Sequence, residues 1–126
     1  MDPLEHKSRK IKFKAWDTES KLLMRLNSID CNKGELIKKN HILLQFTGMT
    51  DLNGDEIYDM DTMLVSNEKY VVCWNDTITG WYFYPIKNPK DLKPFLADQA
   101  AKMTRLGNYF ELNFPPDPKE KKSRWE

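Results

Sequence analysis

The feature that most constrains the fold of this chain is a series of short apolar segments separated by turn residues. Each segment is too short for a helix of ordinary length, and is either rich in β-branched and aromatic residues or alternates between apolar and polar side chains. They lie at residues 11–16, 22–24, 41–50, 70–74 and 81–84. The pattern predicts a mainly β protein with one short helix, folded as a small β-barrel or a strongly bent antiparallel sheet.

Length and composition narrow the class further. A chain of 126 residues corresponds to a single domain. Its 20 Lys and Arg residues against 19 Asp and Glu residues give a net charge of +1, which argues against a protein that coats DNA. The apolar runs are too short to span a membrane, and the first residues lack the apolar core of a secretion signal. We therefore expect a cytoplasmic protein with two reduced cysteines, Cys31 and Cys73.

The two ends of the chain differ from its middle. Residues 1–10 are polar and basic, and we expect them to form a flexible arm. Residues 113–126 combine prolines with charged side chains, which predicts a disordered charged tail. Between them, residues 27–40 read as a loop with one short hairpin. From Asn88-Pro89 onwards, apolar residues recur at helical spacing and predict a helix.

An acidic stretch follows the longest predicted strand. Asn53-Gly54 is a strong tight-turn signal, and five acidic residues surround it without a Lys or Arg between them. The spacing does not fit a calcium-binding loop, because the glycine stands in the wrong register. We interpret the stretch as a hairpin turn with solvated charges, and keep an acidic docking patch and a metal site as alternatives. The residues of the candidate charged rim are Asp55, Glu56, Asp59 and Asp61.

Aromatic residues are concentrated in the predicted hairpin at residues 70–84. Strand alternation places Trp81 and Phe83 on one face and Tyr82 and Tyr84 on the other. Either one face is core and the other is shielded by the helix, or some rings form a binding surface, where Trp and Tyr are enriched. With Lys69 or Lys87 beside them, the same rings could hold a nucleotide. The candidate anchors are Trp74, Trp81, Tyr82 and Tyr84.

Sequence signatures of catalysis are missing. The chain has no nucleophile elbow, phosphate-binding glycine loop or zinc-protease motif, and His41 stands without a recognisable partner. We therefore expect no enzyme, no catalytic residue, no metal and no cofactor. The basic residues near the N-terminus could touch phosphates, but the near-neutral chain makes nucleic-acid binding a minor alternative. They are Lys7, Arg9, Lys10, Lys12 and Lys14.

Three segments together resemble the YopX family of phage and prophage proteins. Residues 12–17, KFKAWD, resemble the family's KFRAWD opening, and residues 106–112, LGNYFEL, are similar to its closing segment. The most specific match is residues 44–58, LQFTGMTDLNGDEIY. In one departure, Met60 stands where the family has a glycine, so the local bend must differ if that glycine needed a positive φ.

The resemblance implies a small, mostly β domain over residues 11–112, and it supplies no established activity. It also places a strand just before Gly107, which limits the predicted helix to residues 89–101 and makes residues 103–106 a strand. Our leading hypothesis is a non-enzymatic phage or prophage protein that binds a host protein inside the bacterium, such as a defence or regulatory component. The alternatives are a sponge that sequesters a nucleotide immune signal and an accessory of phage DNA metabolism. We expect no membrane partner, and leave homo-oligomerisation open.

Overall fold

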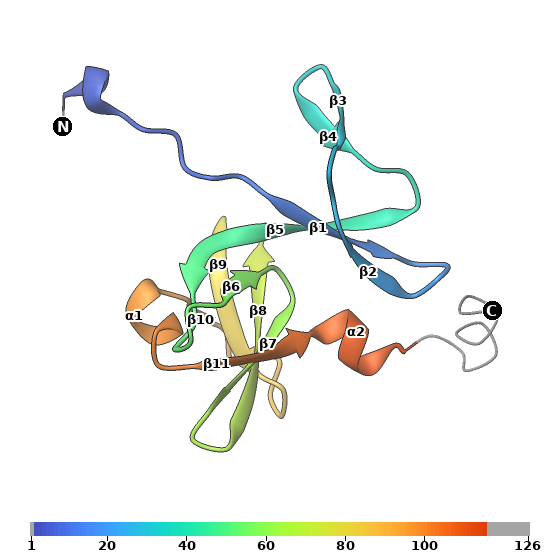
Figure 1. Ribbon diagram of the computed structural model, residues 1–126. Helices are drawn as coiled ribbons and strands as arrows, with labels where there is room; N and C mark the ends of the chain where they lie inside the picture. The colour runs from blue at the N-terminus through green and yellow to red at the C-terminus, as the bar shows by residue number, and fades with distance from the viewer. Residues whose placement is uncertain (1, 116–126) are drawn as a thin grey trace.

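The structure is a computed structural model that describes residues 2–115. It contains eleven strands, two short α-helices and one 3-10 helix (Figure 1). The helical elements are η1 (Pro3–Glu5), α1 (Ala97–Ala100) and α2 (Tyr109–Asn113). The strands are β1 (Phe13–Asp17), β2 (Leu22–Arg25), β3 (Asp30–Asn32), β4 (Glu35–Ile37), β5 (His41–Thr50), β6 (Glu56–Tyr58), β7 (Asp61–Val65), β8 (Glu68–Asn75), β9 (Gly80–Pro85), β10 (Lys93–Pro94) and β11 (Thr104–Asn108).

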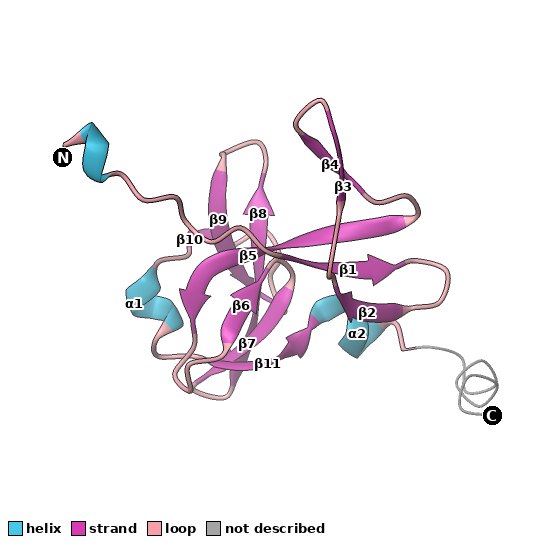
Figure 2. Cartoon of the chain, turned by 45° about the horizontal axis from the view of Figure 1, so that its top comes forward, coloured by secondary structure: helices cyan, strands magenta, loops and turns pink. Residues whose placement is uncertain are grey.

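All strand pairs are antiparallel, and together they form a curled half-barrel with a separate hairpin. The five-stranded sheet has the order β10-β9-β8-β7-β11, and the four-stranded sheet has the order β2-β1-β5-β6. The β3–β4 pair forms a two-stranded sheet that projects from the body of the protein (Figure 2). The predicted mainly β fold with a strongly bent antiparallel sheet is therefore confirmed, as is the short hairpin within residues 27–40.

Strand β5 connects the two main parts of the fold. Its first half pairs with β1, and its second half pairs with β6. The register of the β5–β6 pair shifts between Phe46 and Thr50, and Gly48 within this interval has a φ of +84°. Such a positive φ suits glycine and allows the irregularity that bends a strand. The bend directs the second half of β5 away from β1 and toward the core.

The hydrophobic core lies between the five-stranded sheet and the segment that carries α1. Ile57, Met63 and Val72 are completely buried there. Phe83 packs against Phe95 with ring centroids 5.7 Å apart, and this contact fixes the segment after β9 to the sheet. Burial of several large apolar side chains, at about 1.5–3 kcal/mol each, is the main force that holds the half-barrel together.

The predicted helix is present but much shorter than expected. Only Ala97–Ala100 is α-helical, whereas Lys93–Pro94 pairs with β9 as a strand. Pro94 lacks the N–H that a helix interior requires, and the N–H of Phe95 donates to the carbonyl of Trp81 at 3.0 Å. The apolar residues at helical spacing therefore lie partly in a segment that pairs with the edge strand β9 and not in a helix. Strand β11 agrees with the predicted strand at 103–106, and α2 was not predicted.

The predicted terminal segments are only partly described. Residues 2–10 are all exposed and include the 3-10 turn at Pro3–Glu5. The predicted tail at 113–126 lies outside the described residues from position 116 onward. Cys73 on β8 is half-buried, and Cys31 on β3 is exposed. Within residues 2–115 no helix is long and apolar enough to cross a membrane.

Candidate functional site

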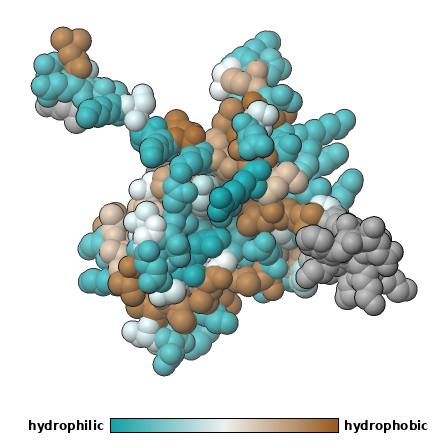
Figure 3. Space-filling model, viewed as in Figure 1, coloured by the Kyte–Doolittle hydropathy of each residue, from teal (hydrophilic) through white to brown (hydrophobic). Residues whose placement is uncertain are grey.

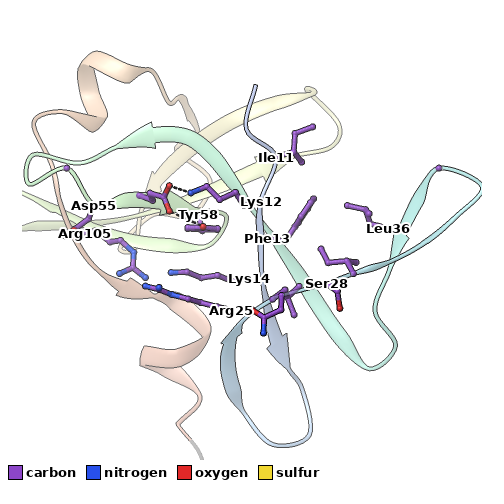
Figure 4. A pocket seen from close by; sticks show the side chains of 16 residues that line it. Ile11, Lys12, Phe13, Lys14, Arg25, Ser28, Leu36, Asp55, Tyr58 and Arg105 are labelled. Carbon is purple, nitrogen blue, oxygen red and sulfur yellow. Dashed lines mark hydrogen bonds and ion pairs between the residues drawn. The ribbon is translucent and has the colours of Figure 1, made fainter. Parts of the chain in front are cut away.

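A broad groove with a volume of about 1070 Å³ runs beside strand β1. Its walls come from β1, from the segment after β2, from the β3–β4 hairpin and from the turn between β5 and β6. Gly34 of the hairpin and Gly54 of the turn also line it. Figure 4 shows the side chains of Lys14 and Phe13 on opposite sides of β1, so the groove has a charged part and a more apolar part.

Three cationic side chains converge in the charged part of the groove. Lys14 comes from β1, Arg25 from the end of β2 and Arg105 from β11, and Figure 4 shows their charged ends pointing toward one another. The ammonium group of Lys14 lies 4.4 Å from the ring centroid of Tyr58. Burial lowers the pKa of Lys14 from its ordinary value, and the positive charge of Arg105 lowers that pKa further.

Arg105 is held in place by a buried carboxylate. Its Nε donates to Oδ2 of Asp61 at 2.7 Å, and Asp61 is completely buried. The same carboxylate accepts from the backbone N–H of Tyr58 at 2.7 Å and from Nδ2 of Asn108 at 3.2 Å. Asn108 is completely buried as well, and its Nδ2 also donates to the carbonyl of Asp59. This network joins β6, β7 and β11 behind the groove.

The turn between β5 and β6 is organised by Asp51. Its carboxylate accepts backbone N–H groups from Asn53 at 2.8 Å, Asp55 at 2.9 Å and Arg105 at 2.8 Å. Burial alone would raise the pKa of Asp51, but these three donors outweigh it and hold the pKa below its ordinary value. The acidic stretch therefore contains the predicted tight turn, and Asp51 ties that turn to β11.

The four predicted acidic residues do not form one exposed rim. Asp55 is exposed on the groove wall, and Glu56 is paired there with Lys12. Asp59 is largely buried, and Asp61 is completely buried. The inclusion of Asp61 in a surface rim is thus corrected, because its oxygens serve internal donors. Burial raises the pKa of Asp59 to about 6, and the nearby charge of Asp61 raises it as well.

The candidate aromatic anchors fall on two faces of the β8–β9 hairpin. Cross-strand pairing sets Trp74 opposite Trp81 on one face, with ring centroids 5.3 Å apart and an edge-on angle of 76°. Trp81 packs against the core, whereas Trp74 is 41% exposed. Tyr82 and Tyr84 lie on the opposite face and are half-buried. The structure therefore brings the two tryptophans together and separates them from the two tyrosines.

The cationic cluster was missed in the sequence. Lys14 belongs to the basic residues near the N-terminus that were expected to be able to touch phosphates, whereas Arg25 and Arg105 are isolated basic residues in a chain with 20 of them. No local spacing links positions 14, 25 and 105, because separate antiparallel pairings bring them to one place. The run of basic residues from Lys7 to Lys14 was the sequence signal that a charged surface would form there.

These features define a class of fold: a small, mainly β half-barrel with a cation-lined groove and an exposed tryptophan, Trp74. The crystal structure of protein EF1440 from Enterococcus faecalis has a similar fold, with a TM-score of 0.54 and 18% identity, over 84% of this chain and 98% of that chain. No curated protein matches the chain. The YopX protein family model matches residues 5–113, and the chain belongs to the YopX family.

Proposed function

We propose that this YopX family protein is a non-enzymatic binding protein that engages a host protein in the bacterial cytoplasm. The family is associated with phages and prophages, which favours a host defence or regulatory component as the target. The observation that carries the proposal is the exposed indole of Trp74, which rests edge-on against Trp81 at the end of the β8–β9 hairpin.

Hydrogen bonds from the backbone and from the indole fix the position of Trp74 at the surface. The backbone N–H of Trp74 donates to Oδ1 of Asp59 at 3.1 Å, and its Nε1 lies 3.4 Å from Oδ1 of Asp76. Ile78 in the adjoining turn is 51% exposed and adds apolar surface. A large aromatic side chain that is already ordered loses little conformational entropy on binding. Tryptophan is also the residue type most enriched at energetically important interface positions.

Capture from a lysate of the bacterium that carries the gene tests this proposal. Tagged wild-type protein, a Trp74→Ser variant and a matched Leu22→Ser variant are compared by mass spectrometry. Leu22 is 40% exposed, close to the exposure of Trp74, but lies on β2 and outside the hairpin. We expect one host protein to be captured by the wild type and by Leu22→Ser, and to be reduced at least about tenfold with Trp74→Ser.

Two results would count against the proposal. Equal capture by Trp74→Ser and the wild type would show that the tryptophan pair is not the interface. Capture of no host protein by folded wild-type chain would contradict the assignment of a host protein as the partner. Circular dichroism spectra and melting temperatures of the three proteins establish that each is folded before capture.

A further inference from the structure

We infer that the cationic part of the groove is a binding site for the phosphate groups of a small phosphorylated ligand. The site consists of Lys14, Arg25 and Arg105, and lies apart from the tryptophan pair that carries the proposed function. The chemistry that it recognises is a di- or oligophosphate. A nucleotide and a free polyphosphate both supply this group, and the experiment below distinguishes them.

The positive charges of this cluster are only partly balanced by carboxylates. Among the described residues, neither Lys14 nor Arg25 has an ion-pair partner. Burial lowers the pKa of Lys14, and the positive charge of Arg25 lies close enough to Lys14 to lower that pKa further. Arg105 lowers it as well. Asp61 pairs with Arg105, and the negative charges of Asp61 and Glu111 partly offset the repulsion at Lys14, but Lys14 and Arg25 are left without an ion pair among the described residues. A single carboxylate would neutralise only one of these two cations, whereas a diphosphate carries charge for both and acceptor oxygens for all three side chains.

The guanidinium of Arg105 is held at the groove by Asp61. Asp61 binds its Nε at 2.7 Å, so the guanidinium is fixed by a buried partner. Within residues 2–115, its two terminal nitrogens donate no hydrogen bond, and the side chain lines the groove. A planar guanidinium held in this way offers a fork that matches two oxygens of a phosphate. Asp61 thus acts as a positioning residue behind the site.

The cations are accessible from solvent, and the groove is large enough for a small-molecule ligand. Arg25 is exposed and Lys14 is only partly buried, so a ligand can reach both from solvent. Figure 3 shows strongly hydrophilic side chains at the centre of the face below the β3–β4 hairpin. A groove of about 1070 Å³ is at the upper end of the range for small-molecule sites. Tyr58 is covered by Lys14 and lines the site without serving as a stacking platform for a base.

Two carboxylates, those of Asp55 and Glu56, also line the groove and affect the binding of an anion. Glu56 is occupied by its ion pair with Lys12. Asp55 is exposed, and its negative charge reaches Arg105 closely enough to contribute to the raised pKa of that guanidinium. Asp55 therefore competes with a bound phosphate for the same cation. Its removal provides a test in which affinity increases.

Isothermal titration calorimetry with the full chain tests the inference. The probes are pyrophosphate, ADP, adenosine and a glutamate-rich peptide, each at the same ionic strength. We expect pyrophosphate, ADP or both to bind with a Kd below about 1 mM, and adenosine to bind at least about tenfold more weakly than ADP. ADP binding more tightly than pyrophosphate identifies a nucleotide as the ligand, and equal affinity identifies a free polyphosphate.

Variants then assign the binding to the three cations. Arg25→Gln and Lys14→Gln should each raise the Kd for pyrophosphate about tenfold, because each removes one charge-assisted contact. Asp55→Asn should lower the Kd about twofold to threefold. Lys102→Gln is the matched control, because Lys102 is exposed next to α1 and does not line the groove. Melting curves of all variants confirm that each remains folded.

Three outcomes would overturn the inference. One is no binding of pyrophosphate or ADP by the wild type below about 1 mM. Another is binding that neither Arg25→Gln nor Lys14→Gln weakens more than the Lys102→Gln control. The third is tighter binding of the glutamate-rich peptide than of either phosphorylated probe, which would assign the groove to an acidic segment of a protein.

Discussion

The carboxylate of Asp61 accepts a hydrogen bond from Nε of Arg105 across 2.7 Å, although 44 positions separate the two residues in the chain. The carboxylate is completely buried at the start of β7, while the arginine reaches from β11 into the groove. Burial alone would lower the pKa of Arg105, but the hydrogen bond and negative charge of Asp61 outweigh burial and raise it. One interaction therefore links the stability of the half-barrel to the geometry of its groove.

Replacement of Asp61 by asparagine should destabilise the protein strongly. The carboxylate serves three donors, from Tyr58, Arg105 and Asn108, and an amide can neither accept all of them nor balance the guanidinium charge. We expect Asp61→Asn to lower the free energy of unfolding by about 2–4 kcal/mol, measured by urea denaturation. Asp55→Asn, at an exposed position in the same stretch, should change it by less than about 0.5 kcal/mol. Similar values for both variants would contradict this assignment.

Asp59 should make the protein less stable as the pH rises through about 6. Its pKa is about 6 in the folded state against an ordinary value of 3.8, so between these values the folded state holds a proton that the unfolded state releases. The free energy of unfolding therefore falls across this window, by up to about 3 kcal/mol from this group. Asp59→Asn should remove that fall, and should be at least as stable as the wild type at pH 7.5.

Urea denaturation between pH 4 and 8 measures this effect as the difference between Asp59→Asn and the wild type. The difference is needed because Asp51 and Glu56 have lowered pKa values and lose stability in the opposite direction, as the pH falls. Glu35→Gln, at an exposed position on β4, is the control. Parallel pH profiles for Asp59→Asn and the wild type would show that Asp59 titrates normally.

Met60 occupies a left-handed backbone position between β6 and β7. Its φ is +67°, its N–H donates to the carbonyl of Val72 at 2.7 Å, and its carbonyl accepts from the N–H of Tyr109 at 2.6 Å. The backbone bend at this position therefore does not have to differ from that of family members with glycine, because Met60 itself adopts the left-handed conformation that favours glycine. Met60→Gly should be at least as stable as the wild type, whereas Met60→Val should lose about 1–2 kcal/mol. Chemical denaturation ranks the three proteins, and a more stable valine variant would contradict the prediction.

Asn108 should be more important for stability than its position next to a short helix indicates. Its Oδ1 accepts from the N–H of Phe110 at 3.1 Å as the N-cap of α2, and its Nδ2 donates to Asp59 and Asp61. Asn108→Ala should cost about 2–3 kcal/mol, since it leaves buried acceptors unpaired and removes the cap. Thermal unfolding should show only a minor shift for Asn113→Ala, an exposed residue at the end of α2. Comparable shifts for the two variants would refute this role.

Sequence reasoning placed most strands correctly because their signals are local. Asn53-Gly54 lies in the turn between β5 and β6, and the aromatic segments at 70–74 and 81–84 form the β8–β9 pair. It overestimated the helix because Leu92, Phe95 and Leu96 repeat at helical spacing while Pro94 pairs with β9. It also treated Asp61 as a surface charge, since a single acidic residue carries no local sign of a buried partner 44 positions away.

What the sequence determined by itself is the class of fold, its turns and its family. Alternation, turn residues and the segment at 44–58 are properties of neighbouring positions, and backbone geometry converts them directly into strands and hairpins. Only the tertiary structure decided which charges are buried and which converge. Lys14 and Arg25 meet because β1 pairs with β2. Arg105 joins them because Asp51 and Asp61 link β11 to β6 and the turn before it. Burial, pKa and ligand geometry depend on such distant contacts, which no local pattern contains.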